Sequence, residues 1–232
     1  MLPQYFDIPF NTFKISTSLL EPTLNRQCLM IHGGARSQDI FHDLRIMLAQ
    51  HHIGSLSFDA IGHGKSSGKL SDSSLALRSL QALHVLKHHP TSSNICFGVS
   101  MGAYNAIKLS QNIPIHSLIL IVPGVYTPDA YNIHFGTEFS KIIRQKDSWF
   151  LSDAWEIIES FKGRLLIISA EYDEVVPNQI PEKLFQSAQQ CEWKHHLMIP
   201  KAIHKGIMEY IFSSNELKKQ FSFYLKKCLF IQ

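Results

Sequence analysis

Short apolar segments alternate along the chain with longer segments in which apolar residues recur every three or four positions. Several short segments are continuous, LILIV at residues 118–122 most clearly, and such runs are typical of strands buried on both faces of a parallel sheet. Strands are predicted at residues 10–16, 28–32, 55–59, 94–99, 117–122, 164–170 and 194–199. Helices are predicted at residues 40–50, 74–88, 101–111, 179–188 and 207–227. This alternation predicts an α/β fold, with a mostly parallel sheet covered by helices on both faces.

One region interrupts the alternation. Residues 124–161 contain no predicted strand but eight aromatic side chains, and a connection this long between two sheet strands is usually functional. We therefore expect a small helical cap inserted at about residues 124–161, with Trp149 and Phe135 lining a substrate pocket. The alternative is a pair of ordinary surface helices. The length of 232 residues fits a single domain, residues 1–232, that includes the cap.

Composition and charge exclude several classes of protein. With 45% hydrophobic residues and a net charge of only +3, the chain is neither intrinsically disordered nor expected to bind nucleic acid. No apolar run approaches the ~18 residues of a membrane span, and no positive side chain precedes Lys14, as a secretory signal would require. The four cysteines lie far apart and lack close Cys or His neighbours, so we expect neither a zinc site nor disulfides. These observations predict a cytoplasmic protein with reduced cysteines and no metal or other cofactor.

The sharpest chemical signal is GVSMG at residues 98–102, which matches the G-x-S-x-G pattern. It lies between a predicted strand and a predicted helix, the strand–turn–helix context of a nucleophile elbow. Glycine on either side lets the strand and helix approach each other closely. The Ser100 hydroxyl would then be exposed at a helix N-terminus, where partial positive charge favours a developing oxyanion.

A serine nucleophile needs a general base and a carboxylate that orients the base. Of the 13 histidines, His204 stands out because it follows the last predicted strand on a short loop before the terminal helix. Asp173 lies just beyond the strand predicted at residues 164–170, with Glu171 and Glu174 as weaker candidates for the acid. Ser100, Asp173 and His204 thus occur in the order Ser…Asp…His, each after a separate strand. We therefore predict that they form a catalytic triad.

An oxyanion hole requires two backbone donors. We expect the Met101 N–H to be one, because Met101 follows the nucleophile. The other is expected from the turn after the first buried strand, with Gly34 preferred and Ala35 second. A glycine pair in this position can also be a plain tight turn. It does not suggest a phosphate-binding loop, because neither G-x-G-x-x-G nor G-x-x-x-x-G-K-[ST] occurs in the chain.

Three motifs together resemble a known superfamily. They are HGG at residues 32–34, FDAIGHGKSSG at 58–68 and GVSMG at 98–102. The combination resembles the α/β-hydrolase superfamily, and within it the branch of monoacylglycerol lipases, feruloyl-type esterases and serine aminopeptidase-like hydrolases. The resemblance implies catalytic places for Ser100, Asp173 and His204, and a structural loop for His63. The extra N-terminal strands of the eight-stranded family sheet are not evident, so we expect a sheet shortened at that end.

These observations predict a serine hydrolase that cleaves a small or medium carboxylic ester, thioester or amide through an acyl-enzyme on Ser100. The expected partner is a small-molecule acyl substrate. Two alternatives stay open: an acyltransferase that uses the same triad, and a non-catalytic hydrolase-fold protein that only binds a ligand. Four cations, with no carboxylate between them, are also expected near the catalytic strand ends, where they would attract an anionic substrate or simply be solvated. They are Arg36, Lys65, Lys201 and Lys205.

Overall fold

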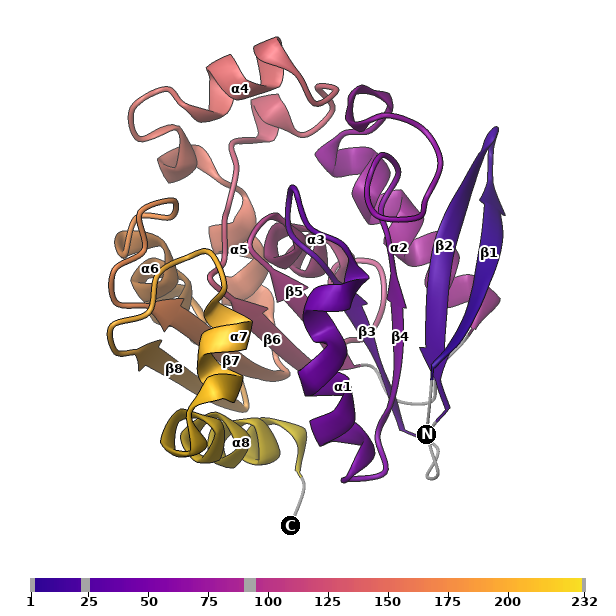
Figure 1. The fold of residues 1–232 in the computed structure, drawn as a ribbon. Coiled ribbons are helices and arrows are strands. Elements are labelled where there is room, and N and C mark those ends of the chain that lie inside the picture. The colour runs from indigo at the N-terminus through magenta and orange to yellow at the C-terminus, as the bar shows by residue number, and fades with distance from the viewer. Residues whose placement is uncertain (1–2, 22–25, 90–94, 231–232) are drawn as a thin grey trace.

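The chain folds around one mixed sheet (Figure 1). The computed structural model describes residues 3–21, 26–89 and 95–230. Within these residues the sheet has eight strands in the order β1-β2-β4-β3-β5-β6-β7-β8. The pairs β1–β2 and β2–β4 are antiparallel, and the other pairs are parallel. The strands are β1 (Gln4–Phe10), β2 (Phe13–Leu20), β3 (Gln27–Ile31), β4 (Gly54–Phe58), β5 (Ile95–Val99), β6 (Ser117–Ile121), β7 (Arg164–Ala170) and β8 (Trp193–Ile199).

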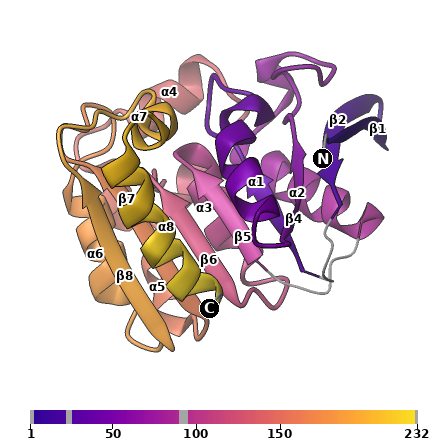
Figure 2. The ribbon, with the colours of Figure 1, turned by 60° about the horizontal axis from the view of Figure 1, so that its bottom comes forward.

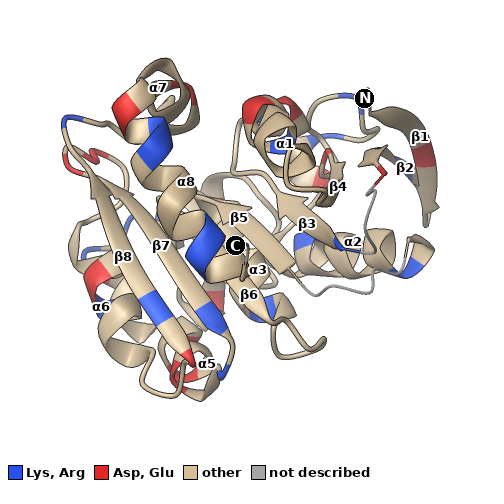
Figure 3. Cartoon of the chain, turned by 90° about the horizontal axis from the view of Figure 1, so that it is seen from below, with Lys and Arg blue, Asp and Glu red and all other residues tan. Residues whose placement is uncertain are grey.

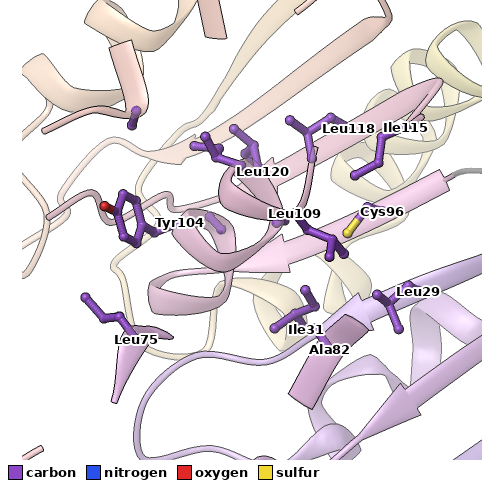
Figure 4. Packing of buried hydrophobic residues seen from close by; sticks show 14 of the residues in the cluster. Leu29, Ile31, Leu75, Ala82, Cys96, Tyr104, Leu109, Ile115, Leu118 and Leu120 are labelled. Carbon is purple, nitrogen blue, oxygen red and sulfur yellow. The ribbon is translucent and has the colours of Figure 1, made fainter. Parts of the chain in front are cut away.

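Helices cover both faces of the sheet, as predicted (Figure 2). On one face lie α1 (His42–Ala49), α7 (Ile207–Ser213) and α8 (Asn215–Leu229), and on the other α2 (Leu75–His88), α3 (Met101–Leu109), α5 (Ala154–Ser160) and α6 (Gln179–Ser187). Successive residues of a central strand point to opposite faces of the sheet. Leu118 and Leu120 of β6 pack in the core between the sheet and the α2/α3 layer (Figure 4), and Ile119 and Ile121 pack in the core between the sheet and the α1/α8 layer. Continuous apolar runs therefore mark these strands, because both faces are buried.

Charged residues are absent from the centre of the sheet (Figure 3). The strands β3, β4, β5 and β6 carry no Lys, Arg, Asp or Glu, and charges occur in the outer strands and on the helices. The four cysteines form no disulfide in this structure. Burial raises the pKa of the Cys28 thiol to about 12, so this side chain stays protonated and packs as a small apolar group. Among the described residues, no helix has the length and apolarity that crossing a bilayer requires.

The N-terminal end of the sheet is fuller than the sequence suggests. In place of one strand at residues 10–16, the hairpin of β1 and β2 turns at residues 11–12, where Asn11 has a φ of 51°. The expectation of a shortened sheet is therefore wrong. Most β1 side chains are exposed or only partly buried, so this edge strand lacks the continuous apolar run that identifies the central strands.

Two predicted elements, a strand at residues 94–99 and a helix at residues 207–227, have bounds that the structure does not reproduce in full. The strand predicted at residues 94–99 is β5, and its first residue, Asn94, lies outside the described residues. The helix predicted at residues 207–227 is two helices, because Ser214 adopts an extended conformation with φ −112° and ψ 124°. The Ser214 hydroxyl accepts a hydrogen bond from the Leu217 N–H at 3.3 Å. Serine thus begins α8 as an N-cap, which a period of apolar residues alone does not reveal.

The connection between β6 and β7 divides into two parts. Its first part contains η3 (Pro128–Ala130), α4 (Thr137–Ile143) and η4 (Ser148–Leu151), and lies above the carboxyl ends of the strands (Figure 1). The Phe135 N–H donates to the Ser73 carbonyl and the Ala76 N–H to the Tyr131 carbonyl, both at 2.9 Å, which attaches this part to the start of α2. In contrast, α5 packs against α3 and α6 in the helical layer. Only the first part of residues 124–161 therefore stands over the end of the sheet.

Candidate active site

Ser100 lies in the sharp turn between β5 and α3, with φ 53° and ψ −119°. This is a conformation that residues other than glycine rarely adopt. Two main-chain hydrogen bonds to the end of β6 and the loop after it hold this conformation. The Ser100 N–H donates to the Ile121 carbonyl at 2.8 Å, and the Ser100 carbonyl accepts from the Gly124 N–H at 3.2 Å. The turn exposes the hydroxyl at the N-terminus of α3, as the motif predicts.

The two glycines of the motif allow backbone to pack on backbone. A Cβ added at Gly98 would lie 2.5 Å from the Ala103 Cα, and one added at Gly102 would lie 2.5 Å from the His32 carbonyl oxygen. Neither position has room for a side chain. The glycines thus bring β3, β5 and α3 together, which places the nucleophile beside the turn that follows β3.

The structure brings His204 and Asp173 to Ser100. The His204 Nε2 lies 3.0 Å from the Ser100 Oγ, and its Nδ1 lies 2.8 and 3.0 Å from the two Asp173 oxygens. A carboxylate can only accept, so the ring proton is on Nδ1 and the Nε2 lone pair faces the serine hydroxyl. The Val175 and Val176 N–H groups also donate to Asp173 Oδ1, at 2.9 and 2.8 Å. The carboxylate is thereby held in place, with only 4% of its side chain exposed.

The two weaker acid candidates support the surrounding loops instead. Glu171 accepts a hydrogen bond from the Lys201 N–H at 2.7 Å, and Glu174 lies 3.4 Å from the main-chain nitrogen of His204. Asp173 is thus the one of the three carboxylates that contacts the imidazole ring of His204.

The turn after β3 lies against the nucleophile. A Cβ at Gly33 would be 3.0 Å from the Ser100 Cβ, and a Cβ at Gly34 would be 3.6 Å from the Met101 Cε. Among the described residues, no hydrogen bond joins the Gly34 or the Met101 N–H to a protein acceptor. These two donors are the pair that the sequence predicts for an oxyanion hole. The second choice, Ala35, follows with a φ of 52°.

The buried side chain of His32 orients this turn, a role that the sequence analysis missed. The Ala60 N–H donates to its Nε2 at 3.0 Å, so the ring proton is on Nδ1, which donates to the Gly33 carbonyl at 2.6 Å. A trans peptide directs its C=O and N–H to opposite sides. The hydrogen bond therefore turns the N–H of Gly34 away from His32. Burial, with the nearby Arg78 charge, holds the His32 pKa well below its usual value and keeps the ring neutral.

Arg78 is a second residue that the sequence analysis missed. Arg78 lies on α2, and its side chain is fully buried. Its Nη2 donates a hydrogen bond to the His32 carbonyl, and its Nε donates to the Asn105 Oδ1 at 3.2 Å. One guanidinium thus joins the turn after β3 to α3, which begins at the nucleophile. Burial lowers its pKa to about 10, so Arg78 remains charged at neutral pH. A single arginine in an amphipathic pattern has no feature that distinguishes it from a solvated one.

The sequence of the chain matches a known protein family. The model of the family described as serine aminopeptidase, S33, matches residues 23–155, more than half of the chain. The chain belongs to this family of α/β-hydrolases. Protein bem46 of Schizosaccharomyces pombe is 31% identical to this chain over 152 residues, which cover 62% of the chain and 49% of bem46. The chain thus spans about half the length of that relative.

Solved structures share the fold of the hydrolase. A CIB-like hydrolase from Thermoplasma acidophilum is 15% identical, with a TM-score of 0.74 over 98% of this chain and 99% of the other. Est1E of Butyrivibrio proteoclasticus, solved with ferulic acid bound, is 19% identical, with a TM-score of 0.72 over 93% and 97%. At these identities the similarity shows the fold alone, and it confirms the predicted α/β-hydrolase architecture.

The two aromatic residues predicted to line a substrate pocket lie in different surroundings. Phe135 is 5% exposed, and its ring meets the ring of Phe139 edge-on, with centroids 4.9 Å apart. Trp149 is half-buried and stacks on Phe150 with centroids 4.0 Å apart. A pocket role for either ring stays a prediction.

The four cations expected near the catalytic strand ends have carboxylates among them, and whether they attract an anionic substrate stays a prediction. Arg36 lies 3.9 Å from the Glu209 carboxylate, and the Lys65 ammonium lies 5.1 Å from the centre of the Tyr5 ring. Glu171 and Glu174 come from the loop that also carries Asp173, so carboxylates intervene at this edge of the sheet. The remaining cations, Lys201 and Lys205, flank His204 in sequence. Within the part of the chain that the structure describes, no group of three or more His, Cys, Asp or Glu side chains is placed to bind a metal ion.

Proposed function

We propose that this hydrolase cleaves carboxylic esters through an acyl-enzyme on Ser100. One observation carries the proposal: a continuous hydrogen-bonded chain from Asp173 through His204 to Ser100, with donor–acceptor distances of 2.8 and 3.0 Å. Beside it, the N–H groups of Gly34 and Met101, which have no acceptor among the described residues, supply donors for a negatively charged oxygen. A nucleophile, a base, an orienting acid and an oxyanion site are the parts that acyl transfer to serine requires.

The proposed reaction begins when His204 Nε2 accepts the hydroxyl proton of Ser100 and Oγ attacks the ester carbonyl. Asp173 stabilises the imidazolium that forms, and the Gly34 and Met101 N–H groups bind the oxyanion. His204 then donates the proton to the leaving alcohol, and the C–O bond breaks. In the second half, His204 takes a proton from water, which attacks the acyl-enzyme and releases the carboxylic acid. Ser100 regains its proton from His204.

An acyl substrate of small or medium size is supported by two observations. Ser100 is half-buried, which leaves the nucleophile reachable from solvent. Est1E, which shares the fold, binds ferulic acid, a small carboxylic acid of the kind that ester hydrolysis releases. We propose the same class of product here.

The test is covalent labelling combined with ester turnover. A fluorophosphonate probe should label the wild type and fail to label Ser100→Ala, and kcat/KM for 4-nitrophenyl butanoate should fall by at least ~10³ in Ser100→Ala and His204→Ala. Asp173→Asn should lose somewhat less, because it removes only the orienting charge. Glu171→Gln is the matched control and should keep most of the activity, since its carboxylate does not touch the imidazole. Undiminished labelling of Ser100→Ala would refute the mechanism.

A further inference from the structure

A tyrosine hydroxyl near the catalytic serine takes no part in the mechanism above. Tyr126 lies on the loop that follows β6. The position that a Cβ would occupy on Gly124 lies 3.2 Å from the Tyr126 hydroxyl and 3.7 Å from the carbonyl carbon of Ser100. The main chain of Gly124 also donates to the Ser100 carbonyl. The phenol therefore stands beside the nucleophile turn, separated from it only by a residue without a side chain.

The Tyr126 ring packs against other aromatic rings, while its hydroxyl has no hydrogen-bond partner among the described residues. The ring packs edge-on against Tyr104 of α3 (Figure 4), with centroids 5.5 Å apart. It is tilted by 39° to the ring of Phe139 in α4, with centroids 6.0 Å apart. Within the described residues no hydrogen bond involves the Tyr126 hydroxyl, and the residue is only partly buried. Burial of the phenol raises its pKa to about 12, so the hydroxyl keeps its proton at neutral pH. A donor with no acceptor is thus held at the site.

A buried cation strengthens this donor. Arg78 and Tyr126 interact electrostatically, and the Arg78 Nη1 is a fully buried nitrogen without a hydrogen-bond partner in the described residues. Arg78 forms no ion pair among those residues. Its positive charge acts against the rise in pKa that burial causes at the Tyr126 hydroxyl, and so favours hydrogen-bond donation by the phenol.

The position of Tyr126 identifies the part of the substrate that it meets. Tyr126 packs in the core on the α2/α3 face of the sheet, whereas α7, which follows His204, packs in the core on the opposite face. His204 must reach the leaving group to donate its proton. The acyl substituent, which points away from the leaving group, is therefore expected on the side of Tyr126.

We propose that Tyr126 is a specificity-determining residue whose hydroxyl donates a hydrogen bond to an oxygen atom in the acyl chain close to the scissile carbonyl. The substrate class would be esters of oxygen-bearing acids, such as alkoxy, hydroxy or oxo acids, in preference to plain alkanoic acids. This inference rests on the proposed ester hydrolysis at Ser100 and adds the acyl group to it.

A pair of esters that differ only by one atom tests the inference. In 4-nitrophenyl methoxyacetate an ether oxygen replaces one methylene of 4-nitrophenyl butanoate, and 3-methoxypropanoate and pentanoate form a second pair with the oxygen one position further out. Each ester is assayed with the wild type, with Tyr126→Phe and with Tyr131→Phe. Tyr131 is the matched control, because its ring also packs edge-on against Tyr104, with centroids 6.1 Å apart. The ratio of kcat/KM within a pair does not depend on the fraction of folded protein.

Tyr126→Phe should lower kcat/KM for the ether ester of at least one pair about three- to tenfold more than for its hydrocarbon partner, which is the range expected for one hydrogen bond. Tyr131→Phe should leave both ratios unchanged. Equal effects of Tyr126→Phe on both members of both pairs, or the same change of ratio in Tyr131→Phe, would overturn the inference. Failure of the proposed function itself would differ, because the wild type would then hydrolyse none of the four esters and resist the fluorophosphonate.

Discussion

Replacing Ser100 by glycine and by alanine measures the strain at the nucleophile. Both variants lose the hydroxyl and its 3.0 Å contact with His204, so the two proteins differ only in the backbone preference of the new residue. At φ 53° and ψ −119°, a residue with a Cβ is strained by about 1–3 kcal/mol, whereas glycine is not. Glycine normally costs about 0.5–1 kcal/mol more than alanine because its unfolded chain is freer. We therefore expect Ser100→Gly to be more stable than Ser100→Ala by about 1 kcal/mol, the reverse of the usual order.

Ser214 provides the matched comparison, because it also precedes a helix but has an ordinary φ of −112°. There glycine should exceed alanine only by the ordinary N-cap difference of about 0.7 kcal/mol, because replacing the serine costs a few tenths of a kcal/mol with glycine and about 1 kcal/mol with alanine. Unfolding in urea, followed by tryptophan fluorescence and far-UV circular dichroism, gives the free energies of unfolding of the glycine and alanine variants at both positions. With a slope of about 3 kcal/mol/M, a 1 kcal/mol difference shifts the midpoint by about 0.3 M. If the glycine–alanine difference at Ser100 were no larger than at Ser214, the backbone at the nucleophile would not be strained and the reasoning would fail.

Two further predictions concern packing and pH. Gly102→Ala should lower the free energy of unfolding by roughly 2 kcal/mol or more, because its Cβ would meet the main-chain oxygens of Ile31 and His32. Gly136→Ala, with nothing within 4 Å of the added Cβ, should lose only the N-cap preference for glycine, about 0.7 kcal/mol, in the same urea titration. Burial, and then the Arg78 charge, lower the pKa of His32 in the folded protein from its ordinary value of 6.5. Below about pH 6.5 the unfolded chain therefore binds a proton at His32 that the folded protein does not bind. The free energy of unfolding should accordingly fall as the pH drops below that value. His32→Gln should make this fall shallower by up to about 1.4 kcal/mol per pH unit, and an unchanged pH slope in that variant would contradict a buried neutral imidazole.

The central strands and the members of the candidate triad could be predicted because their signals are local. In β6 every side chain meets an apolar core on one face or the other, so burial itself produces the continuous run LILIV. Ser100 could be predicted from the glycines of a tight turn, and Asp173 and His204 from their places just after predicted strands. In a parallel sheet such places lie at one edge, so chain order alone predicts that the three residues meet.

The N-terminal hairpin and the break at Ser214 were decided by the tertiary structure. The edge strand β1 buries few of its residues, so its pattern is too weak to separate from the turn at residues 11–12. At Ser214 the apolar period continues across the break, since α7 and α8 both pack against the same core. Periodicity reports which residues are buried, and it does not report where the backbone changes direction.

The surroundings of the nucleophile depended most on the fold. Arg78 and His32 lie 46 positions apart, and nothing in either neighbourhood indicates that the guanidinium is buried or that it holds a carbonyl. Tyr126 was counted among the aromatic residues of a cap, and only the contact with Gly124 places its hydroxyl beside Ser100. The sequence determined which residues are apolar and where each element begins and ends approximately. The packing of the helices on the sheet decided which polar groups meet in the protein interior. Such partners depend on distance and direction in three dimensions, so they leave no periodic signal along the chain.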